Sequence, residues 1–317
     1  MNKWINELFT IWDSIEKGNA AADKFNPDSS GWKKESHIPY LGDYDPMHVL
    51  NLYYPADHDG SKKLKTVIDI HGGGWLYGTV DLSERYLGWI ASQGYAVMGM
   101  NYRLLRETDL KGLVQDIYAA LHWLVRFGPD RGFDLDNVLL TGDSAGGHLT
   151  NLVACIDNSR KLRKAYGVKK SGLKIKALCV CCPCADTNGL YISGEAGTEA
   201  GEGTAAAYKS LMLGEAGEKA GWYKLMGIDE TIPVLDTDPS EMPPELIIGS
   251  ETESLYKQTV FLKKQLKKCG WPYETLIWKK EEAVHLQHVF NISHWEWRES
   301  LISNTGMLKF FERKCIG

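Results

Sequence analysis

The stretch VLLTGDSAGGHLTNLV, residues 138–153, joins an apolar run to a helix-like pattern through a serine enclosed by glycines. Small residues on both sides of Ser144 permit the strained turn that lifts a serine hydroxyl clear of a sheet. The apolar run that ends at Gly142 predicts a buried strand, and the pattern after Ser144 predicts a helix over about 145–158. The stretch therefore indicates a strand-to-helix elbow with Ser144 at its tip.

Apolar runs alternate with helix-like segments along most of the chain. From their apolar spacing, further helices are predicted within residues 1–25 and over 109–127, 254–268 and 296–314. Strands are predicted within residues 47–55, 65–73, 95–103, 137–142, 175–182, 245–250 and 273–280. This alternation predicts the α/β class, with a mostly parallel central sheet and helices on both faces.

One long region interrupts that alternation. Residues 185–241 are rich in Gly, Ala and Glu, and short helices are expected there at about 204–213 and 218–226. We predict a single domain over 1–317, in which residues 1–35 and 185–241 form a small cap.

Composition excludes several classes of partner. The formal net charge of −5 provides no basic surface for nucleic acid. Acidic residues interrupt the apolar pattern of the N-terminal segment, and no window approaches the ~20 apolar residues of a membrane span. We therefore expect a cytoplasmic protein with no membrane partner. Its seven cysteines, an odd number, are expected to be free thiols.

A second glycine-rich motif, HGGGW at 71–75, follows the predicted strand of residues 65–73. The backbone amides of Gly73 and Gly74 can approach a reacting oxyanion there, together with the amide of Ala145 at the helix start. HGGGW and GDSAGG, in this order, resemble the α/β-hydrolase superfamily and, within it, the esterases similar to hormone-sensitive lipase. NYRL at 101–104 and MPPELIIGS at 242–250 resemble further signatures of these esterases.

The resemblance implies that the serine is followed along the chain by an acid and then by a histidine. After the last predicted strand, HVF at 288–290 matches the histidine motif of these esterases, which favours His288 over His285. The acid position falls on Glu253, where the family usually has aspartate. Glu251 is the alternative acid, and Glu253 could also merely begin the charged first turn of a helix.

Several other residues of reactive type are expected to have supporting roles. The resemblance implies that His71 supports the glycine loop, and His148 lies one helical turn beyond Ser144. CVCCPC, residues 179–184, lies in a predicted strand whose side chains alternate between faces, so its thiols are interpreted as buried apolar groups and no metal site is expected. Aromatic residues suited to lining a pocket are Trp75, Tyr77, Trp222 and Tyr223, with Trp75 the predicted substrate contact.

Together these features predict a serine carboxylesterase. Ser144, His288 and Glu253 would be catalytic, and Gly73, Gly74 and Ala145 would form the oxyanion hole. The expected partner is a small ester with a short-chain or acetyl acyl group, and no cofactor is required. Two alternatives stay open, an amidase similar to kynurenine formamidase and a non-catalytic binding member of the fold. The sequence leaves the oligomeric state undetermined.

Overall fold

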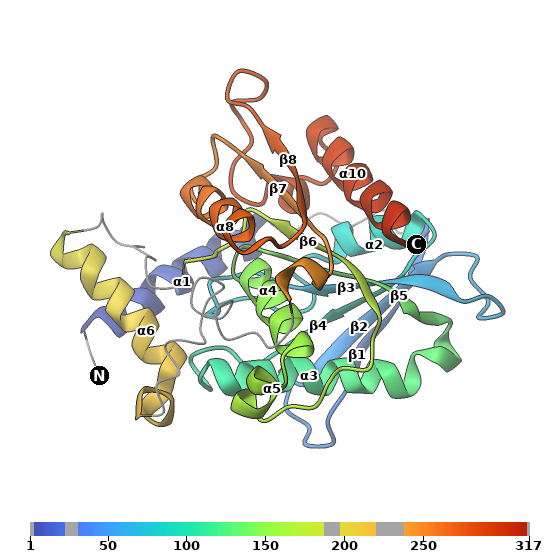
Figure 1. Cartoon of the computed structure of the whole chain (residues 1–317), viewed down its shortest axis with the longest axis horizontal. Helices are drawn as coiled ribbons and strands as arrows, with labels where there is room; N and C mark the ends of the chain where they lie inside the picture. Colours follow the sequence, from blue (N-terminus) through green and yellow to red (C-terminus); the bar gives the residue numbers. More distant parts are fainter. Residues whose placement is uncertain (1–2, 23–30, 187–196, 220–237, 316–317) are drawn as a thin grey trace.

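A computed structural model describes residues 3–22, 31–186, 197–219 and 238–315 of the chain. Within these residues an eight-stranded sheet forms the centre of the fold, in the order β1-β2-β4-β3-β5-β6-β7-β8 (Figure 1). β2 pairs antiparallel with β1 and β4, and the neighbours from β4 to β8 are parallel. The strands are β1 (Trp32–Pro39), β2 (Val49–Pro55), β3 (Leu64–Ile70), β4 (Ala96–Met100), β5 (Phe133–Asp143), β6 (Ile175–Cys181), β7 (Glu245–Ser250) and β8 (Tyr273–Trp278).

The edge strand β1 was not anticipated from the sequence. Its residues WKKESHIP are mostly exposed, because an antiparallel edge strand needs no apolar face on its solvent side. β1 begins at Trp32, so residues 32–35 belong to the sheet and not to the cap predicted over 1–35. The remaining strands overlap the segments that the sequence predicted, although β3 begins earlier, at Leu64, and β5 extends beyond 137–142 at both ends, from Phe133 to Asp143. β4 and β7 are buried along their whole length.

Helices cover both faces of the sheet, which confirms the predicted α/β class (Figure 1). α2 (Glu84–Ser92) and α10 (Arg298–Cys315) pack on one face, and α3 (Leu110–Phe127), α4 (Ser144–Asn158) and α8 (Tyr256–Cys269) on the other. Shorter helices are α5 (Arg160–Tyr166), α9 (Phe290–Ser293), η1 (Pro129–Arg131) and η5 (Pro239–Glu241). In the part of the chain that is described, no helix is long and apolar enough to span a membrane.

Two further helices, α1 (Lys3–Ala22) and α6 (Glu199–Lys219), lie side by side at the left of Figure 1. Gly203 allows close approach, because a Cβ there would come within 2.1 Å of the Trp4 ring. The Trp12 indole donates a hydrogen bond of 2.7 Å to the Tyr208 hydroxyl, and Leu8 is fully buried. α6 contains the short helix expected at 204–213, whereas most of the helix expected at 218–226 lies outside the described residues.

Candidate active site

The serine elbow is built as the sequence pattern requires. β5 ends at Asp143 and α4 begins at Ser144, whose φ of 50° lies in the left-handed region. Gly146 is needed beneath it, because a Cβ there would come within 1.9 Å of the Ile70 carbonyl oxygen on β3. Close contact between the neighbouring strand and the helix start therefore holds the serine in a strained conformation.

Ser144, His288 and Glu253 form a continuous chain of hydrogen bonds. The Ser144 Oγ lies 3.0 Å from His288 Nε2, and His288 Nδ1 lies 2.9 Å from Glu253 Oε2. Glu253 follows β7 and His288 follows β8, so the two side chains meet at the carboxyl edge of the parallel sheet. The Leu255 amide donates to the same Glu253 oxygen at 2.7 Å. In this arrangement the imidazole can accept the serine proton while the carboxylate holds its Nδ1–H.

The alternative acid and the alternative base lie elsewhere. Glu251 accepts hydrogen bonds from the Lys279 ammonium at 2.6 Å and the Lys280 amide at 3.2 Å, and these contacts hold its pKa below the usual value. His285 is half exposed, with its Nε2 3.7 Å from Glu299 Oε2. The fold thus brings Glu253 and His288 to the serine, and neither Glu251 nor His285.

The glycine loop after β3 depends on backbone conformations that favour glycine. Gly73 has a φ of 110° and Gly74 a φ of 59°. The amides of Leu76 and Tyr77 both donate to the Gly73 carbonyl, so the loop closes on itself in a tight turn. A Cβ on Gly74 would come within 2.0 Å of the Trp12 ring, which places α1 directly against this loop.

The amide of Ala145, the residue after Ser144, lies in the first turn of α4, where no carbonyl within the helix can accept its proton.

His71 supports this loop from below. Its ring stacks on Tyr102 at 4.4 Å, and its Nδ1 lies 2.7 Å from the Gly72 carbonyl oxygen. Burial lowers the pKa of His71 to about 4, so the neutral ring donates from Nδ1 to that oxygen. His148 is also buried and meets the Trp75 ring edge to face at 5.4 Å. These positions fit the supporting roles that we expected for both histidines.

Asp143 connects the elbow to the glycine loop, a role that our sequence analysis missed. Its Oδ1 accepts a hydrogen bond of 2.9 Å from the Gly72 amide. Burial raises the pKa of Asp143 to about 6, although this hydrogen bond favours the charged form. A signal was available, because β3 and β5 are adjacent strands with Ile70 opposite Gly142, so the residues that follow them must meet.

A cavity of about 580 Å³ opens above Ser144. Trp12 and Ile15 of α1 contribute to its wall, as does Tyr77 of the glycine loop. The other lining residues are Gly73, Asp81, Leu82, Ser83, Glu84, Arg85, Tyr86, Asp143, His288, Val289, Ile292, Ser293, His294, Trp295 and Glu296. Trp75, our predicted substrate contact, is not among them and is only 1% exposed, packed between His148 and Tyr208. Trp222 and Tyr223 lie outside the described residues.

The cysteines of CVCCPC are buried, and one of them adjoins the serine. Cys184 Sγ lies 3.8 Å from Ser144 Oγ, and the Cys184 amide donates to the Ser144 carbonyl at 2.9 Å. Burial raises the pKa of the Cys184 thiol to about 12, so this group is a neutral neighbour of the nucleophile.

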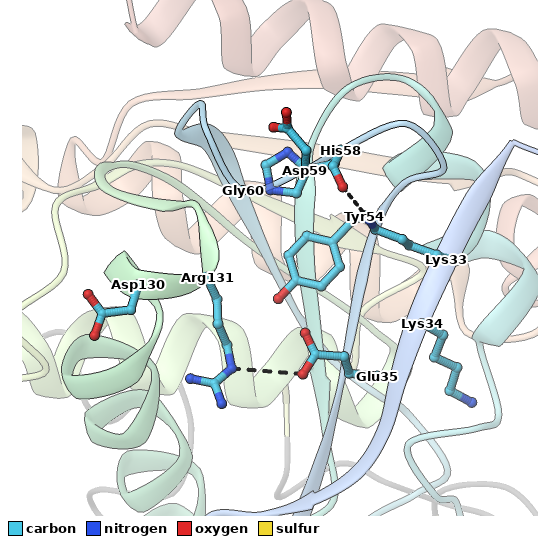
Figure 2. A pocket seen from close by; sticks show the side chains of 9 residues that line it. All are labelled: Lys33, Lys34, Glu35, Tyr54, His58, Asp59, Gly60, Asp130 and Arg131. Atoms are coloured by element: carbon cyan, nitrogen blue, oxygen red, sulfur yellow. Dashed lines mark hydrogen bonds and ion pairs between the residues drawn. The ribbon is translucent and has the colours of Figure 1, made fainter.

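A second pocket, of about 310 Å³, shares no lining residue with the first (Figure 2). Its walls carry both signs of charge, with the Arg131 Nε 3.8 Å from Glu35 Oε2 and the Lys33 ammonium on the carbonyl of His58. Figure 2 shows Tyr54 between these groups and no serine or cysteine among the lining residues. The chemistry of acyl transfer is therefore assembled only at the first of these two pockets.

The chain is similar to known proteins over most of its length. The family model described as BD-FAE matches residues 50–266. The crystal structure of esterase B from Lactobacillus rhamnosis, inhibited by a tributyrin phosphonate, superposes with a TM-score of 0.86 at 39% identity, over 98% of this chain and 94% of that one. Lipase 2 of Moraxella sp. is 35% identical over 44% of this chain, and mouse hormone-sensitive lipase is 31% identical over 36%. The matches span only 33% of Lipase 2 and 14% of hormone-sensitive lipase.

Proposed function

The chain belongs to the BD-FAE family of α/β-hydrolases, and from this premise we propose that it is a serine carboxylesterase. The observation that carries the proposal is the hydrogen-bond chain from Ser144 through His288 to Glu253. Ser144 and His288 of this chain line the cavity of about 580 Å³. The strained φ of 50° at Ser144 supports it, because strain of this kind is retained where a nucleophile must be presented.

In the proposed mechanism, His288 Nε2 accepts the Ser144 proton as Oγ attacks the ester carbonyl carbon. The tetrahedral intermediate then collapses, and His288 gives the proton to the departing alcohol. A water molecule attacks the acyl-enzyme by the same route, so the acid is released and Ser144 regains its proton. Glu253 fixes the tautomer of His288 and stabilises the imidazolium that forms in each step.

The negative charge of the intermediate is assigned to the backbone amides of Gly73, Gly74 and Ala145. Amide donors fixed before the reaction contribute more than donors that must reorient, and each is worth roughly 3–4 kcal/mol of barrier. The Asp143 carboxylate supports this assignment, because it holds the neighbouring Gly72 amide at 2.9 Å and so fixes the start of the loop.

We assign a short acyl group to the substrate and a cap function to α1 and α6. The inhibitor in the L. rhamnosis esterase B structure is a tributyrin phosphonate, so butyryl esters are the first substrates to test. Trp12 limits the cavity, since it lies at Gly74 and stacks on Tyr77 at 6.4 Å while bonded to Tyr208 of α6. Trp75 then supports the cap from inside, rather than contacting substrate.

The proposal is tested first with Ser144→Ala. Removal of the nucleophile is expected to lower kcat for p-nitrophenyl butyrate by a factor on the order of 10⁶, because the triad acts as a unit. The far-ultraviolet circular dichroism and Tm of the variant check that the fold is retained. A folded variant that keeps near-normal kcat would show that Ser144 is not the nucleophile.

A second measurement separates the enzyme classes. Acetyl, butyryl and octanoyl p-nitrophenyl esters are compared with an N-formyl aromatic amide, and we expect kcat/KM to be highest for acetyl or butyryl. Faster turnover of the amide would favour the amidase alternative. Failure of a fluorophosphonate probe to label the folded wild-type protein would favour a non-catalytic binding role, because labelling requires an activated serine.

A further inference from the structure

The proposed mechanism does not use the thiol of Cys182, yet this group adjoins two of the catalytic side chains. Donor atoms of Cys182, Glu253 and His288 all lie within 4.8 Å of one another, and no other group of three or more His, Cys, Asp or Glu residues in the described part of the chain meets that criterion. The three residues follow β6, β7 and β8, so the carboxyl edge of the sheet brings them together. The Cys182 amide donates to the Ile248 carbonyl at 2.8 Å, which fixes the thiol's backbone in place.

Glu253 retains an unused acceptor at this position. Its side chain has no exposed surface, its Oε2 accepts from His288 and Leu255, and its Oε1 has no hydrogen-bond partner among the described residues. A buried carboxylate oxygen without a donor costs free energy that a positive ion can recover. The Cys182 thiol beside it is also fully buried.

We propose that Cys182, Glu253 and His288 form an inhibitory site for a thiophilic divalent cation, Zn²⁺ or Cd²⁺. Zn²⁺ accepts thiolate, imidazole and carboxylate ligands. These three residues would supply one of each and leave the fourth position open to water. Tetrahedral coordination at normal Zn–S and Zn–N lengths places the donors about 3.5 Å apart, so the three side chains need to move by only about 1 Å. His288 is 27% exposed and borders the large cavity, which provides the path of entry.

The inhibition follows from the tautomer of His288 and rests on the proposed function. When the cation binds Nδ1, the proton on that nitrogen moves to Nε2, while the thiol proton of Cys182 is released to solvent. The Nε2 that faces Ser144 is then a donor and can no longer accept the serine proton. The hydrogen bond from Nδ1 to Glu253 Oε2 is lost at the same time, so the carboxylate no longer orients the imidazole. A bound enzyme is therefore folded but inactive, and removal of the cation restores it.

The first experiment measures zinc inhibition of p-nitrophenyl butyrate hydrolysis in wild type, Cys182→Ser and Cys184→Ser, each relative to its own rate in a chelator. Cys184 is the matched control, because its thiol lies 3.8 Å from the Ser144 hydroxyl but outside the three ligands. We expect at least ~10-fold weaker inhibition of Cys182→Ser, with Cys184→Ser inhibited like wild type, and recovery on addition of EDTA. Equal inhibition of all three proteins would overturn the proposal.

The second experiment does not depend on catalysis. Cadmium is titrated into Ser144→Ala, and the ultraviolet charge-transfer absorption of a cadmium–thiolate bond is recorded. The absorption is expected in this variant and absent from Ser144→Ala/Cys182→Ser. Glu253→Gln in the Ser144→Ala background should weaken cadmium binding at least ~10-fold, which keeps the test decisive if the Cys182 variant fails to fold. Absorption without any esterase activity in wild type would reject the proposed function and retain the metal site, whereas activity without absorption would reject the site.

Discussion

A buried glutamate lies near each end of strand β7, and the two carboxyl groups differ in the partners that they contact. Glu253, just beyond the carboxyl end, contacts the His288 imidazole and the Leu255 amide. Glu245, at the amino end, has one side-chain partner, the Asn151 amide at 3.3 Å, and its Oε2 has no partner among the described residues. Burial raises the pKa of Glu245 to about 8, well above its usual value.

The difference shows that burial by itself does not make a carboxylate useful for catalysis. A buried acid without a charged partner becomes a neutral group, as Glu245 does at moderate pH. Glu253 faces an imidazole and a backbone amide that both donate to it, and a catalytic triad needs an acceptor at this place. The carboxyl edge of a parallel sheet supplies such partners because the loops that follow neighbouring strands converge there.

The largest effect is expected for Glu253→Gln. An amide at this position donates to His288 Nδ1 and stabilises the wrong tautomer, so kcat should fall by roughly 10⁴ with little change in Tm. Steady-state kinetics with p-nitrophenyl butyrate measure the change, and differential scanning calorimetry checks the fold. A decrease of less than about tenfold in a folded variant would remove Glu253 from the triad.

A change in stability is expected for Glu245→Gln at the other end of the strand. The raised pKa means that folded Glu245 keeps a proton which the unfolded chain loses above about pH 4.5, so stability is lost as the pH rises from 4.5 to 8. The neutral amide removes this loss and should stabilise the protein by about 4 kcal/mol at pH 7.5, and hardly at all at pH 4.5. Urea unfolding at both pH values measures the difference. Equal effects at the two pH values would show that Glu245 does not titrate in this range.

A smaller effect is expected for Asn151→Ala. The substitution removes the hydrogen-bond donor to Glu245 and should lower the free energy of unfolding by about 1–2 kcal/mol. Urea unfolding at pH 7 checks the value, with kcat as a second readout that is expected to be retained. A double-mutant cycle with Glu245→Gln isolates the energy of the pair, and a coupling energy near zero would contradict the contact.

The smallest effect is expected for Glu251→Gln, the matched control for Glu253→Gln. Glu251 lies two residues away but pairs with Lys279 at the surface, and exposed ion pairs of this kind add little stability because solvent screens them. Its kcat should stay within about threefold of wild type, and its Tm within a degree or two. A loss of activity comparable to that of Glu253→Gln would reverse the assignment of the acid.

The sequence predicted the elements that interleave apolar strands with helices, because burial on both faces of a parallel sheet leaves a strong pattern. The elbow at Ser144 was predicted for a different reason: the strained turn needs glycines close to the serine, and these are visible in the sequence. β1 was missed, because an exposed edge strand such as Trp32–Pro39 has no such pattern. Trp12 was expected on an amphipathic helix. Its contact with Gly74 and its place in the cavity wall could not be predicted, because residues 12 and 74 are distant in the chain and only tertiary packing brings α1 against the loop.

By itself, the sequence determined the α/β class and a short set of candidate residues, because local sterics and hydrophobic periodicity act over a few residues. The α/β-hydrolase superfamily was indicated by the resemblance of two motifs, HGGGW and GDSAGG. The tertiary structure decided which of these candidates meet. Glu253, and not Glu251, lies beside His288. Trp75 is buried away from the cavity, and Asp143 contacts the glycine loop. These contacts join residues that are distant in the chain, and only the register of the strands and the packing of the loops beyond them fix which side chains come within bonding distance.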